Sequence, residues 1–221
     1  MNFKVVEKFI SVNGEGSRSG QLSVFIRFAG CNLSCNYCDT KWANERNVKY
    51  DIMTENEIYN YIKATGITNV TLTGGEPLIQ NDILSLLKLL SSDNNLLVEI
   101  ETNGSVNIKD FLLDKNPPCF TMDYKLPDSG MEDYMCISNF NYLTKKDTVK
   151  FVVSSVNDLK KAKEIIDKYE LIKKTNIYLS PVLGRIYPKA IVDFMKENKL
   201  NKVNLQLQIH KIIWSPNKRG V

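Results

Sequence analysis

The chain has 221 residues, of which 43% are hydrophobic and 24% charged; it is long enough to bury one sizeable core, and we expect a single domain over residues 1–221. The net charge of +4 is small and the lysines are spread along amphipathic segments, so nucleic-acid binding is not expected. No apolar run reaches membrane-spanning length and no secretion signal is recognisable, so we expect a cytoplasmic protein without a membrane partner.

Apolar, β-branched runs alternate with helix-period segments, a pattern typical of a parallel α/β sheet. The predicted strands are residues 3–10, 24–28, 69–73, 96–101, 120–125, 149–153, 177–179 and 203–208. The predicted helices are residues 54–65, opened by a capping box of Thr54 and Glu57; 83–90, capped by Asn81 or Asp82; 159–169, after Asn157 or Asp158; and 189–197, with Pro188 near the first turn. Residues 104–119 and 126–147 are predicted to hold loops or short helices.

The length of the chain limits the architecture that these elements can build. A closed eight-fold βα barrel typically needs about 250 residues, so we predict an open, incomplete TIM-type barrel of about six βα units with a mostly parallel sheet. Chemistry in such folds gathers at the carboxyl ends of the strands. Polar or glycine-rich segments occupy four of these ends, at residues 30–38, 74–77, 102–104 and 125–127.

A C-x3-C-x2-C pattern follows the second predicted strand, formed by Cys31, Cys35 and Cys38. Three thiolates on a short loop can hold three irons of a 4Fe–4S cluster and leave the fourth iron open. A structural zinc site or an electron-transfer cluster would want a fourth protein ligand. The one histidine, His210, lies far along the chain in a strand-like pattern, and Cys119 and Cys136 fit small core side chains better. The pattern therefore favours a cluster with an open iron.

The cysteine pattern after one strand and Gly74-Gly75-Glu76-Pro77 after the next resemble the radical S-adenosylmethionine superfamily. The resemblance implies that the open iron binds the amino and carboxylate groups of S-adenosylmethionine, and that an electron cleaves the sulfonium to give a 5'-deoxyadenosyl radical. It also implies that Gly75 contacts the methionine amine, where a glycine permits close backbone approach. Tyr37 would lie near the adenine or would merely cover the cluster.

The first 40 residues narrow the resemblance further. Asn13-Gly14-Glu15-Gly16, the run of residues 25–30 and Cys38-Asp39-Thr40 closely resemble the 7-carboxy-7-deazaguanine synthase family, and the similarity continues to residues 208–211. The resemblance implies a carbon–nitrogen lyase that converts 6-carboxy-5,6,7,8-tetrahydropterin to 7-carboxy-7-deazaguanine on the route to queuosine and related deazapurines. The radical would remove a hydrogen from C6 of the pterin, the ring would contract, ammonia would leave and S-adenosylmethionine would be regenerated.

The substrate-binding residues implied by this resemblance are Val12, Asn13, Gly14, Arg27, Thr73, Glu101, His210 and Val221. Arg27 has the planar fork that suits a carboxylate, unless it is an exposed strand arginine. Glu101 would accept hydrogen bonds from the aminopyrimidine edge, unless it caps a helix or loop. His210 would touch the substrate or fill the core. Val221 would place its terminal carboxylate in the pocket, although termini usually fray.

The implied cofactors are the 4Fe–4S cluster, S-adenosylmethionine and Mg²⁺. The S-adenosylmethionine site would include Tyr37, Cys38, Asp39, Gly75, Asp123, Tyr124, Lys125, Ser180, Pro181, Val182 and Leu183. Relatives carry Ser-Pro-Lys where this chain has residues 123–125, so Lys125 and the backbone are the safer part of that set. The Thr40 hydroxyl would coordinate Mg²⁺, which prefers oxygen ligands and would neutralise the substrate carboxylate.

The resemblance also implies partners: flavodoxin or ferredoxin as the electron donor, and a second copy of the chain in a homodimer. A glycyl-radical-enzyme activase shares the cysteine pattern and is the alternative within enzymes. The early Gly-Glu-Gly segment, Arg27 and the Asp39–Thr40 pair favour a small carboxylated substrate instead. The alternative from another class is a non-enzymatic iron–sulfur electron-transfer protein, which would not cleave S-adenosylmethionine.

Overall fold

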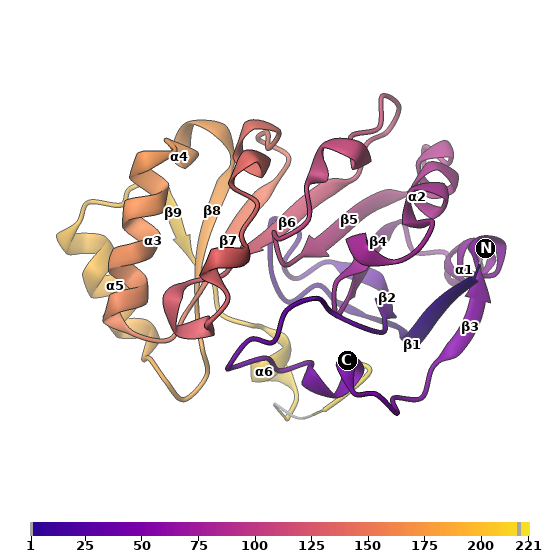
Figure 1. The fold of residues 1–221 in the computed structure, drawn as a ribbon, viewed down its shortest axis with the longest axis horizontal. Helices are drawn as coiled ribbons and strands as arrows, with labels where there is room; N and C mark the ends of the chain where they lie inside the picture. Colours follow the sequence, from indigo (N-terminus) through magenta and orange to yellow (C-terminus); the bar gives the residue numbers. More distant parts are fainter. Residues whose placement is uncertain (1, 216–217) are drawn as a thin grey trace.

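The computed structural model describes residues 2–215 and 218–221. One nine-stranded sheet in the order β3-β1-β2-β4-β5-β6-β7-β8-β9 organises the chain (Figure 1). Its strands are β1 (Asn2–Val12), β2 (Leu22–Phe28), β3 (Asp51–Thr54), β4 (Asn69–Gly74), β5 (Leu97–Thr102), β6 (Cys119–Tyr124), β7 (Thr148–Val153), β8 (Asn176–Pro181) and β9 (Val203–Leu205). The pairings from β2 to β9 are parallel, whereas β1 pairs antiparallel with β2 and β3. This is the open, mostly parallel α/β sheet that the sequence predicts.

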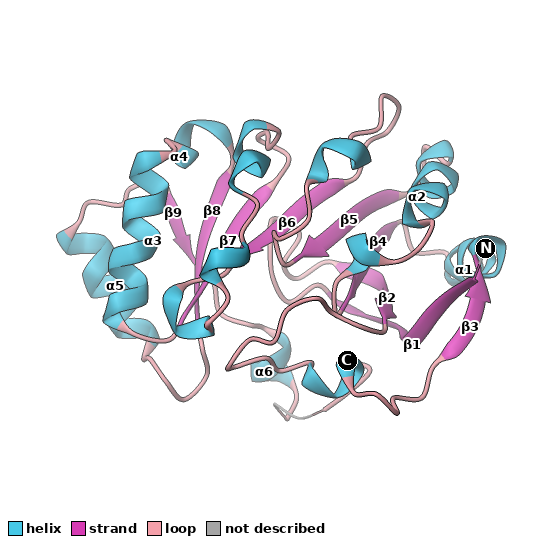
Figure 2. Ribbon diagram, viewed as in Figure 1, coloured by secondary structure: helices cyan, strands magenta, loops and turns pink. Residues whose placement is uncertain are grey.

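The helices cover one face of this sheet. They are α1 (Glu55–Thr65), α2 (Ile83–Ser92), α3 (Val156–Lys168), α4 (Leu171–Lys174), α5 (Pro188–Glu197) and α6 (His210–Ile213). Figure 2 shows α1 and α2 beside the strands at one end of the sheet and α3, α4 and α5 beside β7, β8 and β9 at the other. Helix α6 is set apart from this layer and lies near the C-terminus, on the side where the strands β2 and β4 end.

The two faces of the sheet have different chemistry. Apolar side chains that are at most 2% exposed point under the helices, and they include Ile26, Leu72, Ile100, Met122 and Phe151. The alternate positions on the same strands are polar, and they include Arg27, Thr73, Glu101, Asp123 and Lys150. Parallel strands buried on both faces are usually apolar throughout. The polar face therefore indicates a binding cavity on this side of the sheet rather than a second hydrophobic core.

The eight predicted strands are all present, with boundaries shifted by at most three residues. Residues 104–119 and 126–147 hold short 3-10 helices between loops, as predicted. Strand β3 was not predicted, because it is four residues long and only one of its side chains is buried. The last predicted strand ends at Leu205 rather than at residue 208, and His210 begins α6 instead of lying in a strand. This end of the chain therefore departs from the sheet earlier than its apolar pattern indicates.

One predicted helix start and one predicted side-chain cap need correction, whereas α2 begins at Ile83 as predicted. Helix α3 begins at Val156, and its N-cap is Ser155, whose side chain accepts a hydrogen bond from the backbone of Asp158. The Asp158 carboxylate is instead buried and accepts backbone hydrogen bonds from Asp128 and Ser154. Asp82 occupies the N-cap position of α2 but has left-handed backbone angles and makes no side-chain cap.

Helix α1 has the predicted capping box, which makes Thr54 a test of local stability. The Thr54 hydroxyl accepts a hydrogen bond from the Glu57 backbone, and the Glu57 carboxylate accepts one of 2.7 Å from the Thr54 backbone. Thr54→Ala is expected to lower the free energy of unfolding by about 1 kcal/mol, as measured by urea denaturation. Thr65→Ala, at the other end of the helix, is the comparison, and an equal loss there would argue against a special role of the cap.

Candidate active site

A cavity opens at the carboxyl ends of the parallel strands, on the polar side of the sheet. It gathers most of the predicted site residues on one wall: Val12, Gly14, Arg27, Cys31, Cys35, Tyr37, Cys38, Asp39, Thr40, Thr73, Gly75, Glu101, Asp123, Lys125, Val182, Leu183, His210 and Val221. These residues come from the strands β1, β2, β4, β5 and β6, from the loops that follow strands, and from the C-terminal segment. The parallel pairing from β2 to β9 brings them together because each of these strands has its carboxyl end at the same edge of the sheet.

The three cysteines of the C-x3-C-x2-C loop are free, half-buried and on the cavity wall. The loop is fixed from two sides, because the Asn36 backbone donates to the Ser129 carbonyl at 3.0 Å and the Glu76 backbone donates to the Gly30 carbonyl at 2.9 Å. Burial raises the pKa of the Cys35 and Cys38 thiols, so a bound cation is what would draw them into the thiolate form.

This donor set fits a 4Fe–4S cluster with three protein ligands. Within residues 2–215 and 218–221, neither Cys119 nor Cys136 lines the cavity, and Cys119 is buried in β6. Over the same residues, no three His, Cys, Asp or Glu side chains are gathered around a point where they could bind a single metal ion. In a cubane each cysteine binds a different iron, and the loop offers three.

The Gly74–Gly75 turn at the end of β4 is required by the protein's own backbone. A Cβ on Gly74 would overlap the backbone of Phe28, and a Cβ on Gly75 would overlap the Gly30 carbonyl. The Gly75 backbone also donates to the Phe28 carbonyl at 3.1 Å. Sequence analysis attributed the two glycines to ligand approach, but the space that they leave is occupied first by the segment that carries the cysteines.

Glu76 ties this turn to the next strand. Its fully buried carboxylate accepts hydrogen bonds from the Thr102 hydroxyl at 2.8 Å, the Asn103 backbone at 2.6 Å and the Leu78 backbone at 3.0 Å. Burial raises the pKa of Glu76 to about 7 against the effect of these donors. Asn103 in turn donates to Cys31 Sγ at 3.5 Å. The Gly-Gly-Glu-Pro motif thus supports the cysteine loop from below.

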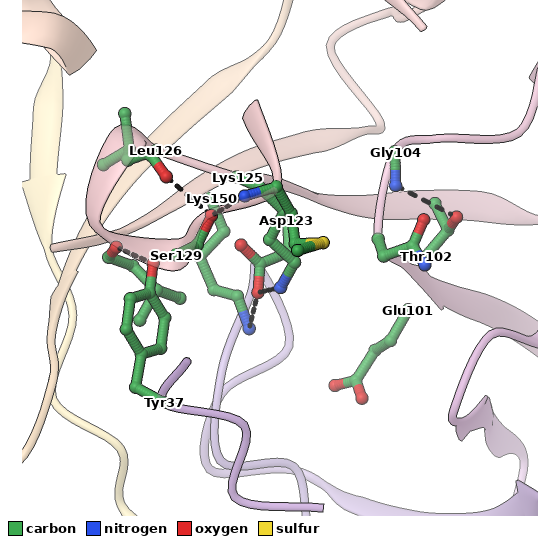
Figure 3. A network of polar contacts seen from close by, with 12 residues as sticks. Tyr37, Glu101, Thr102, Gly104, Asp123, Lys125, Leu126, Ser129 and Lys150 are labelled. Atoms are coloured by element: carbon green, nitrogen blue, oxygen red, sulfur yellow. Dashed lines mark hydrogen bonds and ion pairs between the residues drawn. The ribbon is translucent and has the colours of Figure 1, made fainter. Parts of the chain in front are cut away.

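A cluster of charged residues occupies the middle of the cavity wall. Lys125 Nζ lies 2.9 Å from Asp123 Oδ2, and Lys150 Nζ lies 3.8 Å from the same oxygen; Figure 3 shows the two lysines meeting at Asp123. Lys150 also forms an ion pair with Glu15. Burial would lower the pKa of Lys150, but the carboxylates of Glu15 and Asp123 outweigh it and raise that pKa. Lys150 is therefore a charged ammonium inside the cavity.

Thr73 and Glu101 form a pair on the neighbouring strands β4 and β5. The Thr73 hydroxyl donates to Glu101 Oε2 at 2.7 Å. Burial raises the pKa of Glu101 to about 7, although Lys150 acts in the opposite direction. Glu101 lies in β5 and on the cavity wall, so it is not a helix or loop cap. Its carboxyl group can therefore change protonation near neutral pH inside the site.

Arg27 points into the cavity from β2 and is already oriented by the protein. Its Nε donates to Glu7 Oε2 at 3.0 Å, and the two side chains are 19% and 17% exposed. The guanidinium also lies 6.0 Å from the centre of the Phe9 ring. The contact through Nε leaves the two terminal nitrogens of the fork to an acceptor in the cavity. The alternative of an exposed strand arginine is thereby excluded.

Asp39 and Thr40 follow the last cysteine and line the same cavity. The Thr40 hydroxyl donates to Asp39 Oδ1 at 3.0 Å, and Lys211 Nζ lies 2.9 Å from Asp39 Oδ2. Burial opposes the charge of Asp39, but the Lys211 ammonium prevails and holds the pKa of Asp39 well below its usual range. The Thr40 hydroxyl and the Asp39 carboxylate thus lie beside the cysteine loop, and oxygen atoms of this kind are the ligands that a hard cation prefers.

Tyr37 covers the other side of the cysteine loop. Its hydroxyl donates to the Val152 carbonyl at 3.1 Å, and the Arg185 guanidinium lies 5.6 Å from its ring centre. Burial raises the pKa of the Tyr37 phenol, so the group stays neutral. Its ring is part of the cavity wall together with Val182.

The C-terminal segment packs on two earlier parts of the chain beside the cavity. Gly14 packs so closely on His210 that a Cβ would overlap Nδ1 of the imidazole, and burial lowers the pKa of His210. The Arg219 guanidinium lies 4.0 Å from the centre of the Trp42 ring. That contact brings Val221 onto the cavity wall instead of leaving it frayed.

Four predicted site residues are not on the cavity wall. They are Asn13, Tyr124, Ser180 and Pro181. Asn13 is 1% exposed and its amide donates to Glu99 at 2.8 Å, so it supports the turn from behind. Tyr124 points to the opposite face of β6, where its ring stacks on Phe140. Ser180 and Pro181 are buried at the end of β8.

Sequence reasoning missed several residues of the wall, chiefly Glu15, Asn103, Lys150, Gln208 and Lys211. A signal for Lys150 does exist in the sequence. In the run Thr-Val-Lys-Phe-Val-Val of β7, a lysine interrupts a mostly apolar, buried strand that has a parallel neighbour along each edge. A charge at such a position must face a polar lumen or another charge.

The fold and the site together define a radical S-adenosylmethionine protein. Residues 25–115 match the family model of the Radical SAM superfamily, a span that includes the cysteine loop and the Gly74–Gly75 turn. The fold is also that of a crystal structure of QueE from Escherichia coli, with a TM-score of 0.74 over 94% of both chains at 24% sequence identity.

Full-length relatives identify the family. The 7-carboxy-7-deazaguanine synthase of Clostridium acetobutylicum is 72% identical over 100% of both chains. The synthase of Chlorobaculum tepidum is 35% identical over 98% of this chain and 96% of its own, and that of Methanospirillum hungatei is 36% identical over 96% and 86%. The chain belongs to the 7-carboxy-7-deazaguanine synthase family, as its first 40 residues predict. It is therefore an enzyme, and neither a glycyl-radical-enzyme activase nor an electron carrier.

Proposed function

We propose that this protein converts 6-carboxy-5,6,7,8-tetrahydropterin to 7-carboxy-7-deazaguanine with release of ammonia, in the biosynthesis of queuosine or a related 7-deazapurine. The observation that carries the proposal is one cavity wall that holds the three free cysteines and Gly75 together with Arg27 and Glu101. The 72% identity to a 7-carboxy-7-deazaguanine synthase over the full length supports the same reaction.

The family implies a 4Fe–4S cluster and S-adenosylmethionine, and we assign the cluster to the three cysteines of the loop. When bound, these groups supply a 5'-deoxyadenosyl radical that can take a hydrogen atom from the substrate. Gly75, Lys125 and Val182 then contact the cofactor. Thr40 would hold Mg²⁺, with Asp39 beside it, and the ion would offset the charge of the substrate carboxylate.

The remaining wall residues bind and orient the pterin. The free nitrogens of Arg27 take its carboxylate, and Glu101 accepts hydrogen bonds from its amino edge while Thr73 holds Glu101 in place. The turn at Val12 and Gly14 closes one side of the ring. His210, kept neutral by burial, is a hydrogen-bonding group at the same side. Together these groups hold the substrate in one orientation before hydrogen abstraction.

Arg27→Ala is expected to weaken pterin binding by about 1.5–3 kcal/mol, or about 10- to 150-fold, because a charged, bidentate contact with the carboxylate is lost. The pterin affinity of Arg27→Lys is expected to lie between those of wild type and Arg27→Ala, since lysine keeps the charge but lacks the planar fork of the guanidinium. Binding is measured by anaerobic equilibrium dialysis with the substrate and with tetrahydropterin that lacks the carboxylate. Arg18→Ala, outside the cavity wall, is the control. Equal affinity of Arg27→Ala and wild type would show that the carboxylate assignment is wrong.

Pterin affinity is expected to rise with pH through about 7, where Glu101 ionises. The carboxylate form accepts the amino hydrogens, whereas the protonated form below pH 7 presents a donor in the same place. The ionised fraction grows about tenfold between pH 6 and pH 8 for such a group, and Kd is expected to fall in proportion. Glu101→Gln keeps an acceptor that does not titrate, so its Kd is expected to be flat over this range. A wild-type Kd independent of pH would refute the role of Glu101.

The test of the whole proposal is anaerobic reconstitution with iron and sulfide, followed by incubation with 6-carboxytetrahydropterin, S-adenosylmethionine, Mg²⁺ and dithionite. A deazaguanine product with release of ammonia is expected, with loss of product when Mg²⁺ is chelated. Cleavage of S-adenosylmethionine without a deazaguanine product would retain the superfamily and reject the substrate.

We further propose that flavodoxin or ferredoxin supplies the electron, that the chain is a single domain working as a homodimer, and that it acts in the cytoplasm without nucleic acid or membrane. None of the helices within residues 2–215 and 218–221 has the length and apolar character to cross a membrane.

A further inference from the structure

The carboxylate of Glu15 joins two distant parts of the chain. Its Oε2 forms an ion pair with Lys150 in β7, and its Oε1 accepts a hydrogen bond of 2.8 Å from Gln208. Glu15 belongs to the N-terminal turn, residues 12–16, and Gln208 to the C-terminal segment, residues 206–210. Burial would raise the pKa of Glu15, but the charge of Lys150 prevails and lowers it. Glu15 is therefore ionised, and both of its oxygens are bound within the protein.

The N-terminal turn and the C-terminal segment touch again on either side of Glu15. The Gly16 backbone donates to Oε1 of Gln206 at 2.8 Å. On the other side, Gly14 packs directly against the imidazole of His210. Glu15 thus lies at the centre of a joint between the two segments, and its ion pair attaches that joint to the sheet. Both segments contribute residues to the cavity wall.

Glu15 also determines where the Lys150 ammonium points. Among the described residues, the ion-pair partners of Lys150 within 4.0 Å are Glu15 and, at 3.8 Å, Asp123. Glu101 carries another carboxylate on the same wall, and its side-chain partner is the Thr73 hydroxyl. A buried ammonium without Glu15 would turn toward the remaining carboxylates, since an unpaired buried charge is costly. Glu15 therefore keeps Glu101 available to a ligand.

We propose that Glu15 is a positioning residue that makes the cavity selective for the pterin. It holds the N-terminal turn and the C-terminal segment as one wall, and it keeps Lys150 from occupying the carboxylate of Glu101. The inference rests on the proposed function, because it takes the ligand to be an amino-substituted heterocycle that donates hydrogen bonds to Glu101. Its consequence is that damage to the joint weakens the binding of pterin more than that of S-adenosylmethionine.

Equilibrium dialysis of the reconstituted protein, first with 6-carboxytetrahydropterin and then with S-adenosylmethionine, measures this selectivity without turnover. Gln208→Met keeps the length of the side chain and removes its hydrogen bond to Glu15. It is expected to raise the pterin Kd about tenfold, the usual effect of losing one hydrogen bond to a charged group. Glu15→Gln removes the charge as well, so its pterin Kd is expected to rise further. Lys63→Met, which breaks a surface ion pair with Asp93, is the control and is expected to match wild type.

A pterin Kd that rises at least threefold more than the Kd of S-adenosylmethionine in Gln208→Met supports the inference. An unchanged pterin Kd, or equal weakening of both ligands, overturns it. If Glu15→Gln fails to fold, as judged by circular dichroism, Gln208→Met decides alone. Wild-type protein that binds pterin but forms no deazaguanine refutes the proposed reaction and leaves this comparison valid, whereas wild-type protein that binds no pterin overturns both.

Discussion

Replacing Cys35 by alanine is expected to abolish product formation and to remove the iron–sulfur absorbance of the reconstituted protein. Cys35 is the middle residue of three free thiols on one cavity wall. Its loss leaves two cysteines for a cluster that needs three protein ligands if one iron is to stay open. The fold itself should survive, since the side chain is small and only half-buried.

The matched control for Cys35→Ala is Cys136→Ala. Cys136 is also free and partly exposed, but it lies beside Ser138, away from the cavity wall. It is expected to retain four irons per chain, cleavage of S-adenosylmethionine and full product formation. Iron analysis, the visible spectrum and the yield of 5'-deoxyadenosine measure these properties. A Cys35→Ala protein that keeps its iron and still cleaves S-adenosylmethionine would remove the basis of the cluster assignment.

The sheet could be predicted from the sequence because its strands are short, β-branched runs with apolar side chains on the face that the helices cover. The start of helix α1 was predicted correctly because a capping box involves residues that are only three apart in the sequence. Strand β3 was missed because an edge strand on an antiparallel pairing with β1 needs little burial. Helix α6 was missed because it is a single turn, and its place depends on contacts with the distant turn at Gly14.

The site was predictable where spacing along the chain carries the chemistry. The cysteine loop, Asp39, Thr40 and Gly75 lie within or next to motifs that dictate their own geometry. Predicting several consecutive residues as ligand contacts was wrong inside strands, because neighbouring side chains of a strand point to opposite faces of the sheet. Asp123 and Lys125 therefore reach the cavity while Tyr124, between them, enters the core.

The residues that sequence reasoning missed are defined by long-range pairing. Glu15 and Lys150 are 135 residues apart, and Glu15 and Gln208 are 193 apart. No local pattern relates such positions, although a lysine within an apolar parallel strand does signal a buried partner. The sequence therefore indicates that a charge must be compensated, but only the fold determines which carboxylate compensates it.

Gly75→Ala is expected to reduce the free energy of unfolding by about 3 kcal/mol and to abolish cleavage of S-adenosylmethionine. The new Cβ would overlap the carbonyl oxygen of Gly30 and the side-chain oxygen of Asn44. Backbone cannot move aside as a flexible side chain can, so overpacking here costs the upper end of its usual range. To remove this overlap, the ends of β2 and β4 would have to move apart. That movement would shift the cysteine loop, which begins one residue after Gly30.

Gly66→Ala separates this steric effect from the general cost of replacing a glycine. Gly66 ends α1 in the left-handed conformation, with a φ of 71°, and a Cβ there would meet nothing within 4 Å. Its substitution is expected to cost about 1 kcal/mol of backbone strain and to leave cluster content and cleavage of S-adenosylmethionine unchanged. Thermal unfolding, iron analysis and 5'-deoxyadenosine yield compare the two variants. Equal stability losses with intact cleavage in both would mean that the Gly75 turn does not position the cysteine loop, because only a steric shift of Gly30 links that turn to the iron site.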